Sequence, residues 1–318
     1  MHDSKINWNI YSQMLVDRGD ITLYVDPAIL NNGKELKRMN EGKVGRPYTY
    51  STGLILAAFT VKCLFRIGYR EASGLVRGIA RELGSVLSPV HTEIQDRISK
   101  LRKKDINLNI RELKKGEKRD IAIDSTGIKE INGGEYRTYK YDERKRWIKL
   151  HVSTDKKTKE ILTNVITKEN VHDQTQYKRL INPIVKDLNS NSADKGYDSN
   201  ESFKHAKEHE YDCYIPVRIN ASTKCEPERR EAVREQFGLP IGKQGHNRFF
   251  KRGKLDEWKK KQQEKWKKKV HYGDRWIVEG TFARFKGMFG EFVFSKKGMM
   301  KNKELLLKIG IYNATLIT

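Results

Sequence analysis

One segment near the end of the sequence gathers side chains suited to phosphate chemistry. If residues 273–290 form a helix, which turns by about 100° per residue, Tyr272, Arg275, Glu279 and Lys286 project in one stripe about 60° wide. A carboxylate in that stripe can hold a divalent metal ion, while a guanidinium and an ammonium neutralise phosphates. The same residues also fit an amphipathic surface helix in which Arg275 pairs with Glu279 at i,i+4 spacing. The stripe alone leaves both interpretations open.

Two further carboxylates directly follow stretches with strand-like sequence. Asp124 closes the β-type run of residues 120–124 and precedes Ser125-Thr126-Gly127. Asp194 follows residues 188–192, which are far more polar than an ordinary buried strand. A single Asp after a strand is most often a turn cap. Neither residue therefore identifies a site by itself.

The charge of the chain points to a polyanionic partner. Its 318 residues include 64 Lys and Arg against 41 Asp and Glu, a formal net charge of +23. Solubility requires a magnitude of only roughly 2–8, and such mutual repulsion disfavours a compact state unless a polyanion shares the surface. The natural partners are nucleic acid or an anionic membrane.

Membrane insertion is not expected. The longest apolar stretch, residues 54–61, meets Lys62 well short of the ~18–20 residues that a span requires. The first residues lack the apolar core of a signal peptide. Three widely spaced cysteines form neither a disulfide framework nor a zinc motif. We therefore expect a cytoplasmic, nucleoid-associated protein that binds nucleic acid.

Hydrophobic periodicity predicts a helical first part followed by α/β structure. Helices are expected at about 51–64, 70–83 and 91–104, with Ser51 or Thr52 as the first cap. Three short helices suit a helix-turn-helix-like DNA reader, or equally a small helical cap on the main domain. In the remainder the predicted strands lie at 120–124, 147–152, 161–166 and 213–217, and the predicted helices at 174–188, 202–210, 273–290 and 303–312. Pro216 places the last of these strands at a sheet edge.

These motifs together resemble a known family, the prokaryotic insertion-sequence DDE transposases. Tyr272-x2-Arg275-x3-Glu279-x6-Lys286 is similar to the Y-R-E-K signature of insertion-sequence families four and five. The boxes around the two aspartates resemble the family's first and second catalytic boxes. The remaining similar segments are Trp147-x-Lys149-Leu150-His151, Gly45-Arg46-Pro47 and Asn313. Because the resemblance covers nearly the whole chain, it favours the metal site over the surface helix.

The resemblance implies an RNase H-like α/β fold, a mixed five-stranded sheet flanked by helices. It implies Asp124 at the end of the first strand, Asp194 after a later strand and Glu279 on a helix facing both, as catalytic and metal-binding residues. It also implies two Mg²⁺ ions, with Mn²⁺ as a substitute, roughly 4 Å apart beside the scissile phosphate. The polar sequence of residues 188–192 departs from the apolar strand expected before Asp194 and puts that strand in doubt.

Several basic and aromatic residues are expected to contact DNA. The resemblance implies this role for the signature residues other than Glu279, with ion pairing that orients Glu279 as the alternative. Residues 45–47 form either an arm that enters the DNA minor groove or an ordinary turn. Residues 144–147 form either a clamp on the DNA backbone or a solvated basic face. The candidate residues are Tyr272, Arg275, Lys286, Arg46, Arg144, Lys145 and Arg146.

The roles of three other groups are less specific. The lysine- and tryptophan-rich residues 251–269 either stack on DNA or dock Trp258 and Trp266 into a core. Asp198 either supports Asp194 or caps the next helix, and the cap is favoured. His151, His172 and Cys63 are expected to be structural.

The sequence thus predicts a transposase that binds the terminal inverted repeats of double-stranded DNA as a homodimer. It would cleave the transposon ends and join the 3′-OH to target DNA by transesterification. The alternatives are an inactive, transposase-derived DNA-binding protein and an RNase H-like nuclease without strand transfer. The predicted domains are an N-terminal DNA-binding region, 1–115, and a catalytic domain, 116–318, with a basic insertion at about 218–270.

Overall fold

The computed structural model describes residues 33–85, 88–102, 106–130, 147–221, 225–238 and 252–317, with four isolated positions before residue 33. The chain forms two compact units. One comprises residues 1–111, 129–146 and 285–318, and the other residues 112–128 and 147–284. The predicted division into functional domains at residue 115 stays a prediction. Within the described residues, no single helix is long and apolar enough to cross a membrane, although α3 and α4, bent by 114°, reach that length and composition together.

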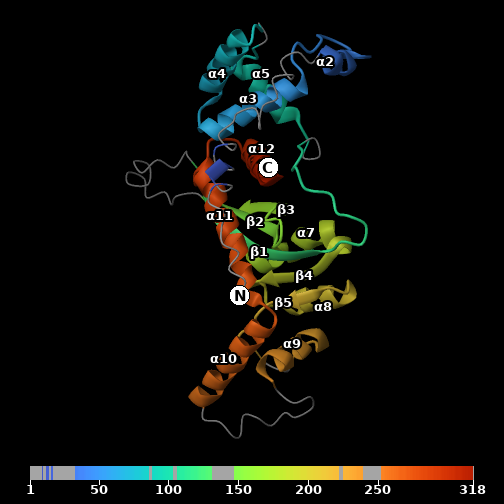
Figure 1. Cartoon of the computed structure of the whole chain (residues 1–318), viewed down its shortest axis with the longest axis vertical. Coiled ribbons are helices and arrows are strands. Elements are labelled where there is room, and N and C mark those ends of the chain that lie inside the picture. Colours follow the sequence, from blue (N-terminus) through green and yellow to red (C-terminus); the bar gives the residue numbers. More distant parts are fainter. Residues whose placement is uncertain are drawn as a thin grey trace, which may run out of the picture. The chain divides into compact units, whose positions relative to one another are not determined.

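The first unit is largely helical. It contains α2 (Gly33–Asn40), α3 (Thr52–Phe65), α4 (Tyr69–Glu82), α5 (His91–Lys100), the short strand β6 (Phe292–Val293) and α12 (Gly298–Ile317) (Figure 1). Helix α3 is mostly buried and packs against α4, α5 and α12. Its N-cap is Ser51, one of the two predicted caps, whose hydroxyl accepts a hydrogen bond from the Leu54 amide. The three predicted helices are confirmed, although the third ends at Lys100, because Leu101 is already extended.

A buried ionic cluster joins α3 to α12. The fully buried carboxylate of Glu304 accepts the backbone N–H groups of Phe294 and Ser295. It also lies 3.5 Å from the ammonium of Lys62 and 2.9 Å from that of Lys308. Burial by itself raises the pKa of Glu304, but these two ammonium groups lower it to about 2. The core of the first unit therefore contains an ionised and fully compensated carboxylate.

The second unit is built on a mixed sheet. Its strands are β1 (Arg119–Glu130), β2 (Trp147–Asp155), β3 (Ile161–Lys168), β4 (Leu188–Ala193) and β5 (Asp212–Tyr214), in the order β3-β2-β1-β4-β5. Strands β2 and β3 are antiparallel, whereas β4 is parallel to β1 and β5. The prediction of five strands misses β6, which pairs with the last two residues of β1. The edge position of β5 is confirmed.

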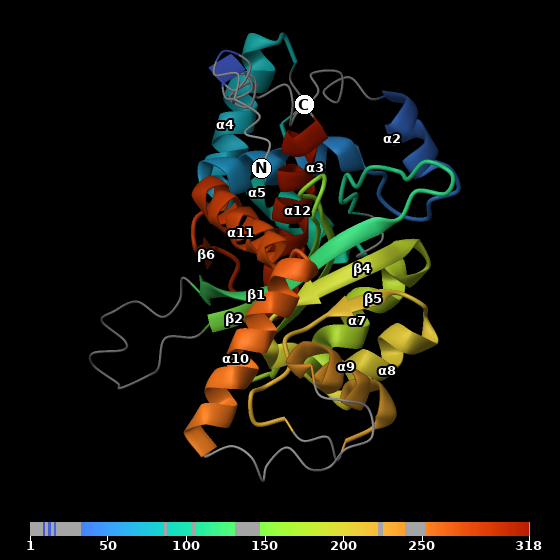
Figure 2. The same ribbon diagram turned by 60° about the horizontal axis from the view of Figure 1, so that its bottom comes forward.

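Helices flank this sheet. Helix α7 (Tyr177–Ile181) packs on β2 and β3, and α8 (Asn200–Glu208) packs on β5. On the other side a 3₁₀ turn, η8 (Tyr272–Arg275), contacts β4 and leads into α11 (Trp276–Phe289), as Figure 2 shows. The predicted helix 174–188 is only partly confirmed, because its α-helical part is limited to α7 and Leu188 already belongs to β4. The chain there forms η4 (Asp173–Gln176), α7 and η5 (Asn182–Asp187), because Pro183 cannot continue the amide ladder of α7.

Strand β4 forms despite its polar sequence. Its Ser190, Asn191 and Ser192 side chains are buried, and each makes a hydrogen bond, although Asn191 Oδ1 has no partner among the described residues. The bonds run from Ser190 Oγ to Asp120, from Asn191 Nδ2 to the Tyr177 hydroxyl, and from Lys156 Nζ to Ser192 Oγ. Buried polar groups are costly only when they lack such partners. The doubt about a strand before Asp194 is therefore resolved in favour of the strand.

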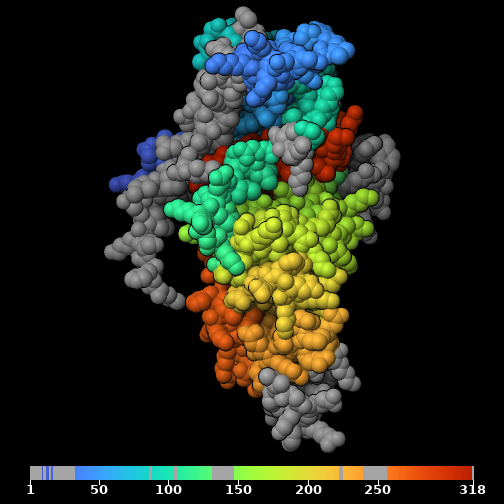
Figure 3. Space-filling model, turned by 90° about the vertical axis from the view of Figure 1, so that its right-hand side faces the viewer, coloured from blue at the N-terminus to red at the C-terminus, as the bar shows by residue number. Residues whose placement is uncertain are grey.

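The basic insertion contributes a helical pair to the second unit. Helices α9 (Pro227–Phe237) and α10 (Arg252–Lys269) pack together, and α9 packs on α8, which lies beside it on the surface seen in Figure 3. Gln236 accepts the Val217 amide, and Gln263 donates to the Val217 carbonyl. Trp266 is buried, so this tryptophan docks into the core and is not available for stacking on DNA.

Asp198 anchors the insertion. Its fully buried side chain receives the Nε and Nη2 hydrogen bonds of Arg229, at 2.8 and 2.9 Å. Helix α8 is capped by Ser199, whose hydroxyl accepts the Ser202 amide. The prediction that Asp198 caps this helix is therefore wrong by one residue. Its physical role is an ion pair with α9.

Candidate active site

Asp124 and Asp194 occupy equivalent places on neighbouring parallel strands. The register pairs Ile123 of β1 with Ala193 of β4, and each aspartate follows directly. Strand β1 continues to Glu130, so Asp124 lies within the strand and not at its end as expected. Burial, and to a smaller extent the charge of Asp194, raises the pKa of Asp124. The sheet itself therefore brings two of the three predicted carboxylates together.

Arg275 connects the third carboxylate to the first. Its Nη1 lies 2.9 Å from Asp124 Oδ2, and its Nη2 lies 2.9 Å from Glu279 Oε1. The Asp124 and Arg275 side chains are mostly buried, whereas the Glu279 side chain is 60% exposed. One planar guanidinium thus spans the gap between two carboxylates, a geometry to which the fork of Arg is suited. The i,i+4 pair considered from the sequence is present, and the same guanidinium also reaches Asp124.

Tyr272 holds the segment that contains Arg275 against strand β4. Its hydroxyl donates to the Ala193 carbonyl at 3.0 Å, directly before Asp194. Its ring lies beside Trp266, with the centroids 6.2 Å apart. Burial raises the pKa of Tyr272 to about 12, so the hydroxyl stays protonated and can donate. Arg275 belongs with Tyr272 to a 3₁₀ turn and not to the predicted helix 273–290, because α11 begins only at Trp276.

A fourth acidic residue, Asp173, contacts Ser125, the residue after Asp124. Its Oδ1 accepts the hydroxyl of Ser125 at 2.8 Å and lies 2.8 Å from Lys149 Nζ. The Nδ1 of the fully buried His151 is 3.2 Å from the same oxygen. Burial by itself raises the pKa of Asp173, but contacts with His151, Lys149 and Ser125 lower it below the ordinary range.

Sequence reasoning misses Asp173. The residue lies in a polar turn after β3, where nothing in the local sequence separates it from a cap. The only signal is that Lys149 and His151 are two residues apart on one strand and so face one side of the sheet. His151 is buried as expected of a structural residue, and its Nε2 contacts the Thr167 hydroxyl.

Tyr197 is the innermost group of this region. It is fully buried on the turn η6 (Lys195–Tyr197), which follows Asp194 and packs against η4. Among the described residues its hydroxyl has no hydrogen-bonding partner. Burial, followed by the charges of Asp173, Asp124 and Asp194, raises the pKa of Tyr197. A neutral hydroxyl therefore lies near three carboxylates.

The other candidate DNA-contacting residues do not belong to the described part of the second unit. Lys286 is further along α11 in the first unit, where its charge acts on Glu291. Arg144, Lys145 and Arg146 lie outside the described residues.

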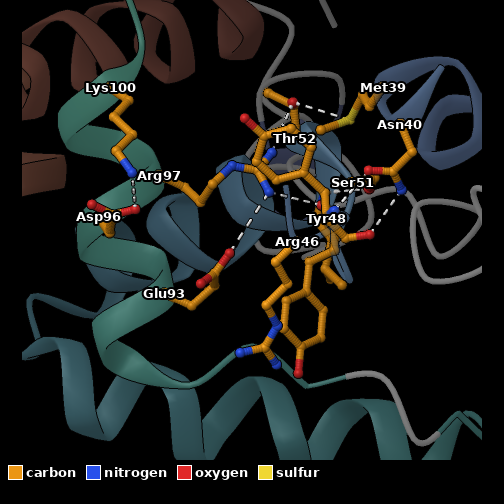
Figure 4. Close-up of polar contacts among 12 residues, drawn as sticks. Met39, Asn40, Arg46, Tyr48, Ser51, Thr52, Glu93, Asp96, Arg97 and Lys100 are labelled. Atoms are coloured by element: carbon orange, nitrogen blue, oxygen red, sulfur yellow. Dashed lines mark hydrogen bonds and ion pairs between the residues drawn. The ribbon is translucent and has the colours of Figure 1, made fainter. Parts of the chain in front are cut away.

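Arg46 is exposed in a loop of the first unit, beside Tyr48 (Figure 4). Asn40 holds both backbone groups of Tyr48, and the guanidinium of Arg97 lies 4.3 Å from the Tyr48 ring centroid. Lys43 Nζ donates to the Arg46 carbonyl. This loop is therefore braced on both sides and presents Arg46 outward.

The chemistry of the three predicted carboxylates fits a magnesium or manganese site. Carboxylate oxygens are the ligands that these ions prefer. Within the described residues, however, no three His, Cys, Asp or Glu side chains lie close enough together to hold an ion in this arrangement. The guanidinium of Arg275 takes one oxygen of Asp124 and one of Glu279. The donor set is therefore suitable, but a metal ion would require this arginine to move.

Comparisons with known proteins identify the family to which this chain belongs. A family model described as a transposase DDE domain matches residues 115–314, and a second model with the same description matches residues 16–133. A solved piggyBac transposase synaptic complex with hairpin DNA is similar at 12% identity and a TM-score of 0.43, over 96% of this chain and 74% of that chain. Because the first family match spans more than half of the chain, the protein belongs to the transposase DDE domain family.

Proposed function

We propose that this DDE transposase is a member of the Y-R-E-K branch, insertion-sequence families four and five, and that it has an RNase H-like catalytic core. Its catalytic residues would be Asp124, Asp194 and Glu279. The observation that carries the proposal is the pairing of Asp124 and Asp194 on adjacent parallel strands, with Glu279 tied to Asp124 through Arg275. All four residues of this branch's signature are present in the sequence at the expected spacing, as Tyr272, Arg275, Glu279 and Lys286.

The three carboxylates would hold two Mg²⁺ ions, for which Mn²⁺ can substitute. Such ions lower the pKa of an attacking water and stabilise the leaving 3′ oxygen during in-line displacement. Asp124 and Asp194 would be the fixed ligands, because the strands hold their backbones. Glu279 is more exposed and lies on a helix, so it would complete the site.

The remaining signature residues would contact the transposon-end backbone. Arg275 has the planar fork that binds phosphate oxygens in two places, and Lys286 supplies a point charge. When a phosphate takes the guanidinium, Asp124 and Glu279 lose their shared partner and become available as ligands. Tyr272 would keep the turn in place through its bond to the Ala193 carbonyl.

The partner would be double-stranded DNA, bound at the terminal inverted repeats by a homodimer that brings two ends together. Helices α3, α4 and α5 would form the DNA-binding part of the N-terminal region. The braced loop makes Arg46 a candidate for groove contact, and Arg144, Lys145 and Arg146 are proposed as backbone contacts.

The test uses a supercoiled plasmid that carries the gene with its flanking DNA, a second plasmid as target, and Mg²⁺. We expect strand-transfer products from the purified chain and none from Glu279→Gln, with DNA binding retained by both. Binding without cleavage in Mg²⁺ or Mn²⁺ would instead identify an inactive DNA-binding protein. Cleavage without joining would identify a nuclease. Either result would overturn the proposal.

DNA affinity is expected to fall steeply with salt, because Lys and Arg release condensed counterions when they neutralise phosphates. Six or more phosphate contacts would weaken binding at least about a thousandfold between roughly 50 and 200 mM salt. Fluorescence anisotropy with a labelled duplex measures this slope. Arg46→Ala should reduce the magnitude of the slope of log affinity against log salt concentration by about one. Lys178→Ala, which removes an equal charge from an exposed pair with Glu201, should leave it unchanged. A flat salt response would contradict a broad phosphate-binding surface.

A further inference from the structure

Asp173 contacts side chains from two strands beside the proposed active site: it accepts one hydrogen bond, from Ser125, and lies within ion-pair distance of Lys149 and His151. Ser125 comes from β1, and Lys149 and His151 come from alternate positions of β2. His151 in turn contacts Thr167 on β3. A single carboxylate oxygen thus terminates a polar network that crosses three strands of the sheet.

This network reaches Asp124 through one residue. The Ser125 amide donates to Asp124 Oδ1 at 2.8 Å, while the Ser125 hydroxyl donates to Asp173 Oδ1 at 2.8 Å. The backbone and side chain of Ser125 are therefore held at the same time, one by each carboxylate. Loss of the bond to Asp173 would free the Ser125 side chain and loosen the amide that orients Asp124.

The network also approaches Asp194. The turn η4, which begins at Asp173, packs against η6, which follows Asp194 and carries the buried Tyr197. Asp173 thus lies between strand β1, which it contacts at Ser125, and the turn that follows β4. Its contacts with Ser125, Lys149 and His151 all use Oδ1, and its side chain is 27% exposed. It would therefore act on the site by holding these segments and not by donating a ligand.

We propose that Asp173 is a positioning residue of the active site, which orients Asp124 for metal binding through the hydroxyl of Ser125. This inference rests on the proposed function, because it takes Asp124 as a metal ligand. Groups that orient metal ligands are commonly worth about 10–100-fold in metal affinity or activity. A merely structural ion pair would change stability and leave metal affinity unaltered.

The test compares Asp173→Ala, Ser125→Ala and the double variant with the wild-type chain. Mn²⁺ affinity is read from the free-ion electron paramagnetic resonance signal, and cleavage from the plasmid assay in a single turnover. We expect each single variant to lose about 10–100-fold in Mn²⁺ affinity and in cleavage rate. The double variant should lose no more than the more strongly affected single variant. Asp173→Asn keeps a carbonyl oxygen to accept the Ser125 hydroxyl and should recover most of the loss.

Asp187→Asn is the matched control, since Asp187 is exposed on η5 and should behave as wild type. Wild-type Mn²⁺ affinity in Asp173→Ala or Ser125→Ala, or losses that add in the double variant, would overturn the inference. Ser125→Ala removes only a hydroxyl and so keeps the test valid if Asp173→Ala does not fold. If the wild-type chain and the Asp187 control both fail to cleave, the proposed function fails. If they cleave and the Asp173 variants match them, only the positioning role fails.

Discussion

Asp124→Asn is expected to abolish metal-dependent DNA cleavage while the chain stays folded. The substitution keeps the shape of the side chain but removes the charge that would hold an ion. Losing a metal ligand removes several kcal/mol of transition-state stabilisation, and about 4 kcal/mol corresponds to roughly a thousandfold in rate. Single-turnover cleavage of the plasmid measures this loss.

The same substitution should leave stability unchanged or raise it slightly. Burial raises the pKa of Asp124, so the fold disfavours its ionised form relative to water. The neutral amide avoids this cost, and Arg275 keeps its second partner, Glu279. Thermal unfolding and DNA binding are the controls. Cleavage within tenfold of wild type, or a large drop in melting temperature, would contradict the assigned role.

Glu304→Gln is expected to destabilise the first unit by about 3–5 kcal/mol, the range measured when one partner of a buried ion pair is removed. The ammonium groups of Lys62 and Lys308 are almost fully buried and would lose the carboxylate that they share. Hydrogen exchange at the amides of α3 and α12 reports this change for the first unit by itself. Glu82→Gln, in an exposed pair with Arg81, is the matched control and should have no measurable effect.

The cluster also predicts how stability depends on pH. The pKa of Glu304 is about 2 in the folded chain, against 4.5 for an ordinary glutamate. A lowered folded pKa contributes stability that is fully present above the unfolded value and is lost as the pH falls towards the folded value. We therefore expect the wild type to lose about 3 kcal/mol between roughly pH 5 and pH 2, at 1.36 kcal/mol per pKa unit. Glu304→Gln should lack this part of the acid dependence, and an unchanged profile would contradict the ionised state of Glu304.

Much of the fold follows from local patterns in the sequence. The capping Ser51, the apolar run after it and the Pro near β5 predict elements that the structure contains. The failures occur where tertiary contacts decide. Strand β4 forms because its polar side chains find partners on other elements, which local polarity cannot reveal. The short strand β6 depends wholly on pairing with the end of β1.

The contacts of the candidate site likewise divide into those that local sequence predicts and those that depend on tertiary structure. The spacing of Arg275 and Glu279 on consecutive turns predicts their contact, and the structure shows it. The contact of Arg275 with Asp124 spans 151 positions in the sequence and depends on the sheet. Asp173 is invisible to sequence reasoning because its partners come from two different strands. Residue type and local spacing thus predict candidates, whereas long-range pairing selects among them.

The shared guanidinium of Arg275 has a consequence for how the enzyme would be switched on. It acts as a built-in counterion for Asp124 and Glu279, so a divalent cation entering the empty enzyme must compete with it. A DNA phosphate that draws the arginine away removes this competitor. Each ligand would then strengthen the binding of the other by the same factor, as thermodynamic linkage requires. On the proposed function, the enzyme would load its ions cooperatively with transposon ends and bind metal more weakly when no DNA is bound.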